Sequence, residues 1–320
     1  MAQPTVSRWK RGQVAAKIET TYGTDAVLAA ADLIEVRNIV FRVTQEQFRD
    51  ERISGAITDL PDIPGARSAV LSFEALLRGA AVAYSASVKP EVDALLRACG
   101  LAATGSFGVG TEKWDYKPQS AATIGESVTA ALFVENAPQG KLLGAFGTAR
   151  FMNRVGQPAV LAVTLTGLYV APADIALLTG TISTVQPPVF KSGAVTVAAY
   201  TPRVASFDVD LGNDVQLIQS ANDAQGVAGV LIAWRRLLAT LDPEAVTVAT
   251  FDWHNKRDLG TLLATTWQVG TTQYNRIKYN APKLQVLDIT DIQRNGLRAY
   301  QIAAKLNANT GGDELTITAD

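Results

Sequence analysis

Residues that could carry catalytic chemistry are scarce in this chain of 320 residues, which contains one histidine and one cysteine. His254 lies in the stretch FDWHNKRD near Asp252, and a histidine beside a carboxylate can act as a general base. However, the sequence has no GxSxG elbow, and any Ser-His-Asp triad would have to use this one histidine. We therefore expect His254 to cap or pack at a strand-to-helix junction, and we predict no catalytic residues.

Metal and thiol chemistry have equally little support. One Cys with one His cannot supply a tetrahedral zinc site unless carboxylates or a second chain complete it. The run Gly311-Gly312-Asp313-Glu314, with Asp320, lacks the alternating ligand spacing of a calcium loop and is better interpreted as a strand start after a glycine turn. Cys99, on the apolar face of an expected helix, is interpreted as a small core residue. We predict no metal.

Two glycine-containing stretches invite comparison with phosphate-binding loops. In Gly105-Ser106-Phe107-Gly108-Val109-Gly110 the glycines are spaced wrongly for GxGxxG. Gln139-Gly140-Lys141 lacks the Ser or Thr and the upstream Gly of a P-loop. We interpret both stretches as turns and predict no cofactor.

Composition narrows the class of protein further. Apolar residues make up 48% of the chain, and 29 basic against 30 acidic residues give a formal charge of -1, so no global field would hold a polyanion against the surface. A chain of this size favours two domains. No apolar run is long enough to span a membrane and the N-terminus lacks a signal-peptide core, so we expect synthesis in a cytoplasm without membrane anchoring.

Short stretches of alternating or β-branched apolar residues, separated by Gly, Pro, Asn and Asp, predict antiparallel β structure. The expected strands are Leu33 to Val43, Ser68 to Leu76, Ser127 to Val134, Ala159 to Val170, Val195 to Tyr200, Val204 to Leu211, Ala245 to Trp253, Lys283 to Thr290 and Leu297 to Leu306. Asn295-Gly296 suits a tight hairpin turn, because both residues tolerate positive φ.

Two helices are expected beside these strands. From Pro90 to Cys99, an N-terminal proline and acidic residues precede an apolar face, and Gly100 stops the helix. From Lys256 to Trp267, an apolar stripe of the same kind recurs. The fold class predicted is all-β with small flanking helices.

The expected elements occur in the same order twice: strand, long polar loop, strand, helix, then a hairpin ending in an extended apolar strand. The loops are Thr44 to Arg67 and Gly212 to Gln225, and the hairpins are Ala145 to Val170 and Lys283 to Thr318. We expect an N-terminal arm (1–31), a first β domain (32–170), a linker (171–188) with a short helix in PADIALL, and a second β domain (189–320).

The segment from Gln45 to Ser68 is about twice the usual length of a hairpin connection, yet it carries apolar residues among charged ones. A long loop can simply be disordered, but this mixture favours a segment that becomes ordered by docking on a neighbour. The residues expected to make this contact are Phe48, Arg49, Arg52, Ile53, Pro61 and Pro64.

Four stretches, taken in order, resemble the tail tube proteins of long-tailed, siphovirus-type bacteriophages. They are KIETTYGTDA (Lys17 to Ala26), LLRACGLAAT (Leu95 to Thr104), LAVTLTGLYVAPAD (Leu161 to Asp174) and GGDELTIT (Gly311 to Thr318). The resemblance spans most of the chain and rests on the order and spacing of these structural motifs.

The resemblance implies a structural virion protein whose β-sandwich or barrel domains close into rings by inter-subunit sheet pairing and stack into a tail tube that conducts DNA. It also implies tail terminator, tape measure and distal tail proteins as partners. Many such subunits have one domain and form hexameric rings. Two tandem tail-tube-like domains favour a trimer with pseudo-sixfold symmetry, with a hexamer as the alternative.

Two other classes of protein remain open at this point. One is another β-rich virion component, namely a baseplate, fibre or capsid-decorating protein, which would form closed trimers without stacking. The other is a carbohydrate-active or hydrolytic enzyme, which would need a convergent carboxylate pair that the sequence alone does not reveal.

Overall fold

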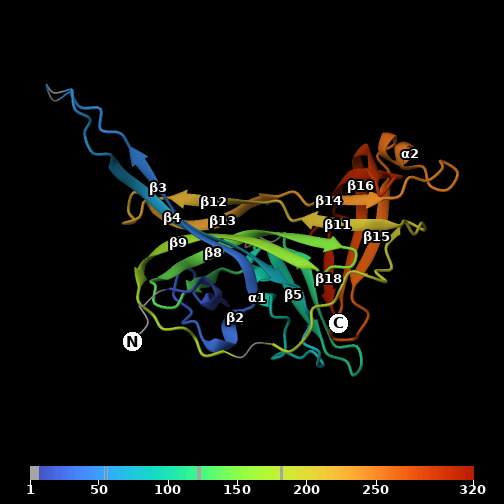
Figure 1. The fold of residues 1–320 in the computed structure, drawn as a ribbon, viewed down its shortest axis with the longest axis horizontal. Helices are drawn as coiled ribbons and strands as arrows, with labels where there is room; N and C mark the ends of the chain where they lie inside the picture. Colours follow the sequence, from blue (N-terminus) through green and yellow to red (C-terminus); the bar gives the residue numbers. More distant parts are fainter. Residues whose placement is uncertain (1–6, 54, 56, 121–123, 181–182) are drawn as a thin grey trace.

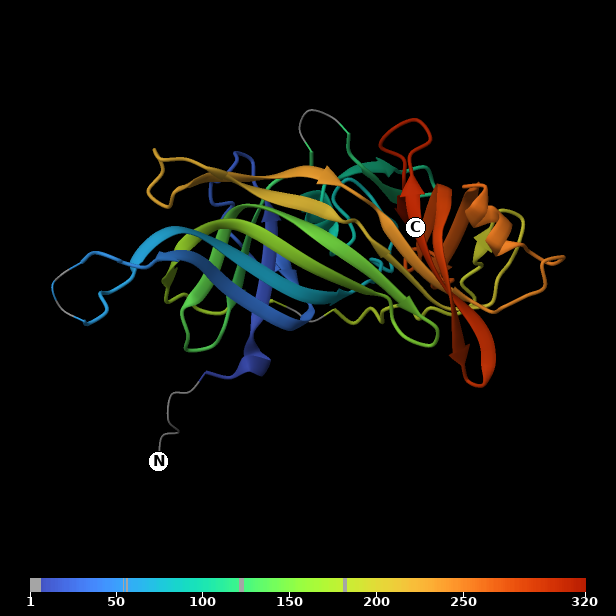
Figure 2. The ribbon, with the colours of Figure 1, turned by 90° about the horizontal axis from the view of Figure 1, so that it is seen from above.

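A computed structural model describes residues 7–53, 55, 57–120, 124–180 and 183–320. It consists almost wholly of antiparallel strands, with two short α-helices (Figure 1). Two hairpins project from the body: β3–β4 extends away from it, and β12–β13 runs along one side of it (Figures 1 and 2). The expected fold class, all-β with small flanking helices, is confirmed.

The elements of the first half are β1 Gln13–Ile18, β2 Leu33–Ile34, β3 Val36–Phe48, β4 Ile63–Leu76, α1 Asp93–Ala98, β5 Leu101–Ser106, β6 Lys113–Pro118, β7 Val128–Phe133, β8 Gln139–Arg154 and β9 Val160–Ala173. Those of the second half are β10 Thr196–Val197, β11 Val204–Asp210, β12 Asn213–Gln219, β13 Val227–Arg235, β14 Leu238–Pro243, α2 Trp253–Asp258, β15 Leu262–Val269, β16 Ile277–Arg294, β17 Leu297–Asn307 and β18 Thr316–Ala319. Single 3-10 turns at Trp9–Arg11 and Ala30–Asp32 precede β1 and β2.

Sixteen strands join in one branched sheet, and β12 and β13 pair only with each other. The main path runs β2-β1-β7-β8-β11-β14-β17-β16-β18-β6-β5, and β9, β4 and β3 branch from β8. The two halves are therefore hydrogen-bonded to each other, through β8 with β11 and through β6 with β18.

The pairing order of the first half, β1-β7-β8-β9-β4-β3, recurs in the second half as β10-β15-β16-β17-β14-β11. A bulge recurs at the same place. Val36 pairs with Ala75 just before the bulge in β3, and Val204 pairs with Pro243, 168 residues later in both strands, just before the bulge in β11. The helices also correspond, since each is followed, two residues after its end, by a glycine with positive φ: Gly100 after α1 and Gly260 after α2.

An aromatic cluster joins the two halves in the core. Phe207 of β11 stacks on Trp267 of β15 with ring centroids 4.0 Å apart, and Trp267 stacks on Tyr279 of β16 at 4.8 Å. Phe151 of β8 meets the edge of the Tyr279 ring at 5.7 Å. All four side chains are almost completely buried, so the contact between the halves is part of the main core.

The first expected helix is confirmed as α1, but the second is mostly wrong. Helix α2 ends at Asp258, and Gly260 then adopts φ +61°. The residues that follow form β15, in which Leu263, Thr265 and Trp267 are buried alternately with exposed neighbours. This alternation has the two-residue period of a half-buried strand. The helix was predicted because the three leucines at the start of this stretch are also spaced as on one face of a helix.

Most expected strands are confirmed, with two exceptions. Ala245 to Trp253 contains no strand and leads irregularly into α2. Of the candidate Val195 to Tyr200, only Thr196–Val197 is a strand. The PADIALL segment forms no helix, because β9 continues to Ala173 and the following residues to 180 are irregular. Gln139-Gly140-Lys141 begins β8 and is not a turn.

Both expected long loops are shorter than predicted, because their flanks are strands. In the first half β3 and β4 extend to Phe48 and Ile63, so the loop comprises residues 49–62, of which 54 and 56 lie outside the described residues. In the second half, β12 occupies half of the segment from Gly212 to Gln225. The expected N-terminal arm contains β1, which lies between β7 and β2 in the sheet.

Candidate assembly surfaces

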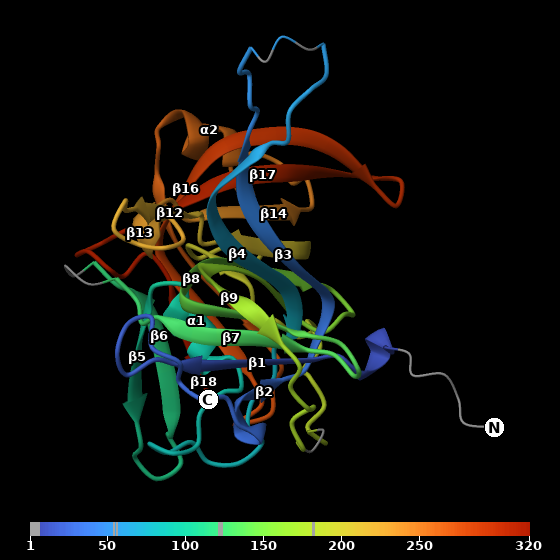
Figure 3. The same ribbon diagram turned by 90° about the vertical axis from the view of Figure 1, so that its left-hand side faces the viewer.

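The outer part of the β3–β4 hairpin, which we call the free arm (residues 43–68), projects beyond the body of the molecule (Figures 1 and 3). Its apolar side chains are exposed: Phe48 is 55% exposed and Ile63 52%, while Ile53 and Ile57 at the tip are fully exposed. Apolar side chains gathered on a projecting hairpin are typical of a surface that binds another protein. The free arm is therefore a candidate contact surface.

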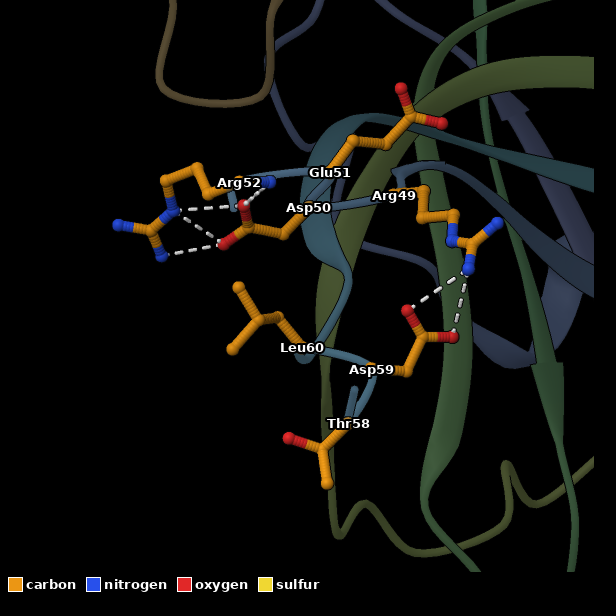
Figure 4. Close-up of a pocket in the computed structure, with 7 residues that line it drawn as sticks. All are labelled: Arg49, Asp50, Glu51, Arg52, Thr58, Asp59 and Leu60. Carbon is orange, nitrogen blue, oxygen red and sulfur yellow. Dashed lines mark hydrogen bonds and ion pairs between the residues drawn. The ribbon is translucent and has the colours of Figure 1, made fainter. Parts of the chain in front are cut away.

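The tip of the free arm, from Arg49 to Leu60, is held by two local ion pairs, shown in Figure 4. Arg49 donates to both carboxylate oxygens of Asp59 at 3.1 and 3.2 Å. Arg52 donates through Nε and Nη2 to Asp50, and this contact holds the pKa of the Asp50 carboxyl below its ordinary value. The described residues that line the hollow of about 310 Å³ between them all belong to this loop, so none of the other described elements completes a ligand site there.

Three of the six predicted contact residues, Arg49, Arg52 and Ile53, lie in this tip, and Phe48 and Pro61 flank it directly. Phe48 ends β3, and its ring lies against Gly65, where a Cβ would come within 2.4 Å of the ring. Ile53 and Pro61 lie in the loop with the two arginines. Pro64 does not, because it belongs to β4 and pairs with Gln47.

The corresponding hairpin of the second half, β12–β13, is docked, and we call it the docked arm (residues 211–236). Val230 and Ile232 are buried with Phe146 of β8 in a small cluster. Tyr22 stacks on Phe146, and its hydroxyl accepts a hydrogen bond from the Val230 amide at 2.6 Å. The docked arm thus lies against the first half of the same chain.

Polar contacts fix the base of the docked arm. The Asn213 side chain donates to the carbonyls of Cys99, at the end of α1, and Gly147, in β8, at 2.7 and 2.9 Å. Arg235 donates to Glu314 at 2.9 Å. Because these bonds are part-buried and reach three separate segments, they determine where the arm lies.

The KIETTYGTDA motif stabilises the contact between Tyr22 and the docked arm. Glu19 is buried, and its carboxylate accepts hydrogen bonds from Ser127 Oγ, Thr129 Oγ1 and the amides of Gly23 and Gly144, all at 2.7 to 2.9 Å. The turn that these bonds fix carries Tyr22. The motif therefore acts structurally, by positioning the side chain on which the docked arm rests.

The junction between the halves is a short ladder. Residues 150–154 of β8 pair with residues 206–210 of β11, from Arg150 opposite Asp210 to Arg154 opposite Ser206. Arg150 also forms an ion pair with Asp208 at 3.0 Å across the two strands. The first half thus pairs with the second through the edges of β8 and β11, within one chain.

Several other strand edges are open, among them the end strands β2 and β5, and two of them belong to strands that are counterparts of β8 and β11. β15 covers one side of β16 only from Ile277 to Gln285, and among the described residues no strand pairs with that side of residues 287–294. β3 pairs with β4 and, within the described part of the chain, with no other strand. Sequence reasoning missed the β16 edge, because the Asn295-Gly296 signal identifies a hairpin and not the side of it that lacks a partner.

The residues first considered for chemistry have structural surroundings. His254 lies in α2, where its ring meets the Tyr300 ring edge-on at 5.6 Å. Burial raises the pKa of the Cys99 thiol. The Asp313 carboxylate is bonded to the backbone of Asn309, Thr310 and Gly311, as in a turn. No group of three potential metal ligands occurs among the described residues.

Two findings from comparison with known proteins complete this description. A search of curated proteins returned no match to the chain. The family model for phage tail tube protein matches residues 9–319, nearly the whole chain. None of the helices in the described ranges is long and apolar enough to cross a membrane. The chain belongs to the phage tail tube protein family and is a structural component of the virion tail.

Proposed function

We propose that this chain contributes two positions to each ring of the tail tube, so that three chains form a ring with pseudo-sixfold symmetry and rings stack axially. The observation that supports this most is the recurrence of one pairing order in both halves, with the bulges of β3 and β11 at matched positions. In this view residues 32–170 and 189–320 are tandem tail-tube-like domains joined by 171–188. β1 belongs to the sheet of the first domain.

Ring closure follows from the physics of strand edges. An open edge presents unpaired N–H and C=O groups, and pairing it with another chain removes a site of aggregation. The free edges of β3 and β16 belong to different halves, so they form a head-to-tail contact, which gives a closed ring when the rotation closes.

The tip of the free arm makes the axial contact between rings in this proposal. Phe48 and Ile53 anchor it, Arg49 and Arg52 exchange their local carboxylates for acidic groups across the interface, and Pro61 and Pro64 stiffen the return. Fixing such a segment costs roughly 1–2 kcal/mol per residue in backbone entropy, which is recovered only on stacking.

The tube is a passive conduit without catalysis or cofactor, through which the genome passes. With a formal charge of -1, the chain has no excess of cations that would bind phosphates and slow the passage of DNA. Synthesis takes place in the host cytoplasm, and the tail terminator, tape measure and distal tail proteins are partners. No feature of the described residues favours a baseplate, fibre or capsid-decorating role.

Electron microscopy of the purified protein tests this function. We expect tubes with a constant axial repeat and a mass per repeat of three chains. Closed trimers that do not stack would indicate a different virion component, and six chains per ring would refute the two-position model.

A further inference from the structure

The internal junction between β8 and β11 provides a template for the contact between neighbouring chains. In the repeat, β11 corresponds to β3 with a separation of 168 residues, since Val36–Ala75 matches Val204–Pro243. The template joins the first half's β8 to the second half's β11. The same junction between chains would join β16 of one chain to β3 of the next.

The residues of β16 that correspond to those of β8 in the repeat can be identified from the strands that pair with each. Phe73 of β4 pairs with Val163 of β9, and Leu241 of β14, 168 residues after Phe73, pairs with Ile302 of β17. Val163 and Ile302 are therefore counterparts.

Val163 in turn pairs with Ala149 of β8, and its counterpart Ile302 pairs with Ile289 of β16. Each residue in this part of β8 thus corresponds to the β16 residue 140 positions later. The template segment 150–154 corresponds to residues 290–294, which lie on the uncovered part of the β16 edge.

We propose that residues 38–42 of β3 pair antiparallel with residues 290–294 of β16 in the next copy of this chain, with Val40 opposite Ile292 and Arg42 opposite Thr290. This inference rests on the proposed tail tube function and specifies its ring contact. β3 and β16 lie toward opposite ends of the molecule (Figures 1 and 2), as a head-to-tail contact requires.

Charge complementarity supports this register. In the template, Arg150 and Asp208 lie diagonally across the strands and form an ion pair. In the proposed ladder, Arg42 lies diagonally opposite Asp288 on the same face. Both are exposed, and neither has an ion-pair partner among the described residues.

Exposed apolar side chains support the same contact. Leu211, the residue directly after β11, is 1% exposed. Its counterpart in the first half, Val43 of β3, is 40% exposed. Where the free edge of β16 begins, Leu262, which pairs with Gln285, is 47% exposed and Leu287 is 40% exposed. A neighbouring free arm seated here would cover them, as the docked arm covers Phe146 in the first half.

Paired cysteines test the register. In a Cys99→Ala background, Val40→Cys with Ile292→Cys places two thiols on directly opposed residues, where Cα atoms about 4.5–5.5 Å apart suit a disulfide. The matched control is Val40→Cys with Asp291→Cys, whose side chains point to opposite faces of the sheet. Oxidised tubes are then resolved on a denaturing gel.

We expect the Ile292 variant to form a ladder of linked chains that ends at three, and the control to remain largely monomeric. If both variants form tubes and are linked equally or not at all, the proposed pairing is wrong while the tube function stands. If the unmodified protein forms no tubes, the proposed function itself fails.

A charge exchange gives a second readout. Arg42→Asp and Asp288→Arg, each alone, should lower the yield of tubes at low salt several-fold, and the double variant should restore it. The isolated subunits should melt at unchanged temperatures, because neither side chain forms an ion pair with any residue that the structure describes. Equal loss in single and double variants would contradict the proposed register.

Discussion

The two projecting hairpins occupy corresponding places in the repeat but have different surroundings. In the docked arm Val230 is 2% and Ile232 6% exposed, whereas in the free arm Phe48 and Ile63 are more than half exposed. The difference lies in what is next to each arm. The docked arm lies against the first half along its length, whereas the free arm contacts its own chain near its base, where the Arg67 amide donates to the Gln225 carbonyl at 3.1 Å. The docked arm therefore shows how such a hairpin is completed.

The largest effect should come from removing the tip of the free arm. Replacing Arg49 to Pro61 with a short Gly-Ser turn should leave a folded subunit that forms rings but does not elongate, because the proposed axial contact is lost while the strand edges remain. Microscopy and sedimentation would distinguish rings from tubes. Polymerisation at the unmodified rate would move the axial contact to the N-terminal arm, Met1 to Ala31, or to the C-terminal tail.

A matched pair of truncations compares the two arms directly. Ile232→Ala removes a buried side chain and should lower the free energy of unfolding of the subunit by about 2–5 kcal/mol. Ile63→Ala, on the free arm, should change it by less than about 1 kcal/mol but reduce tube formation. Chemical denaturation of the isolated subunit measures both values. Equal losses would mean that the free arm is already packed in the single chain.

Polar side chains at the bases of the two arms should also differ in how much they stabilise the isolated subunit. Asn213 donates to the carbonyls of Cys99 and Gly147, so Asn213→Ala should cost about 1–3 kcal/mol by leaving them unpaired. Its counterpart Gln45, which pairs with Arg67 as Asn213 pairs with Arg235, is exposed, and Gln45→Ala should cost almost nothing. A stability loss at Gln45 that matched the loss at Asn213 would contradict the assigned difference.

The smallest effect is expected at His254. Its ring contacts Tyr300 on the surface of α2, so His254→Gln should leave tube assembly and particle infectivity nearly unchanged. Plaque counts and tube yield measure this. Loss of a measurable turnover in the variant would show that the conduit is also an enzyme.

The comparison also shows which features the sequence could predict. Alternating apolar residues identified β4, β9 and β17, because one buried face imposes a two-residue period. The flanks of the free arm were predicted as loop because Thr44 to Phe48 is exposed on both faces and shows no such period. The arm residues were found from their mixed composition, which is a local property. The open edge of β16 is a tertiary property and could be seen only once β15 was in place.

A reconstruction of the assembled tube without imposed symmetry would show how many chains form a ring and which strands join them. We expect three chains per ring, with β3 of each chain hydrogen-bonded to residues 290–294 of β16 in the next chain. The strands of the free arm should lie beside that β16 as the docked arm lies beside β8, and its tip should contact the adjacent ring. Six chains per ring, or β3 paired with any strand other than β16, would contradict this arrangement.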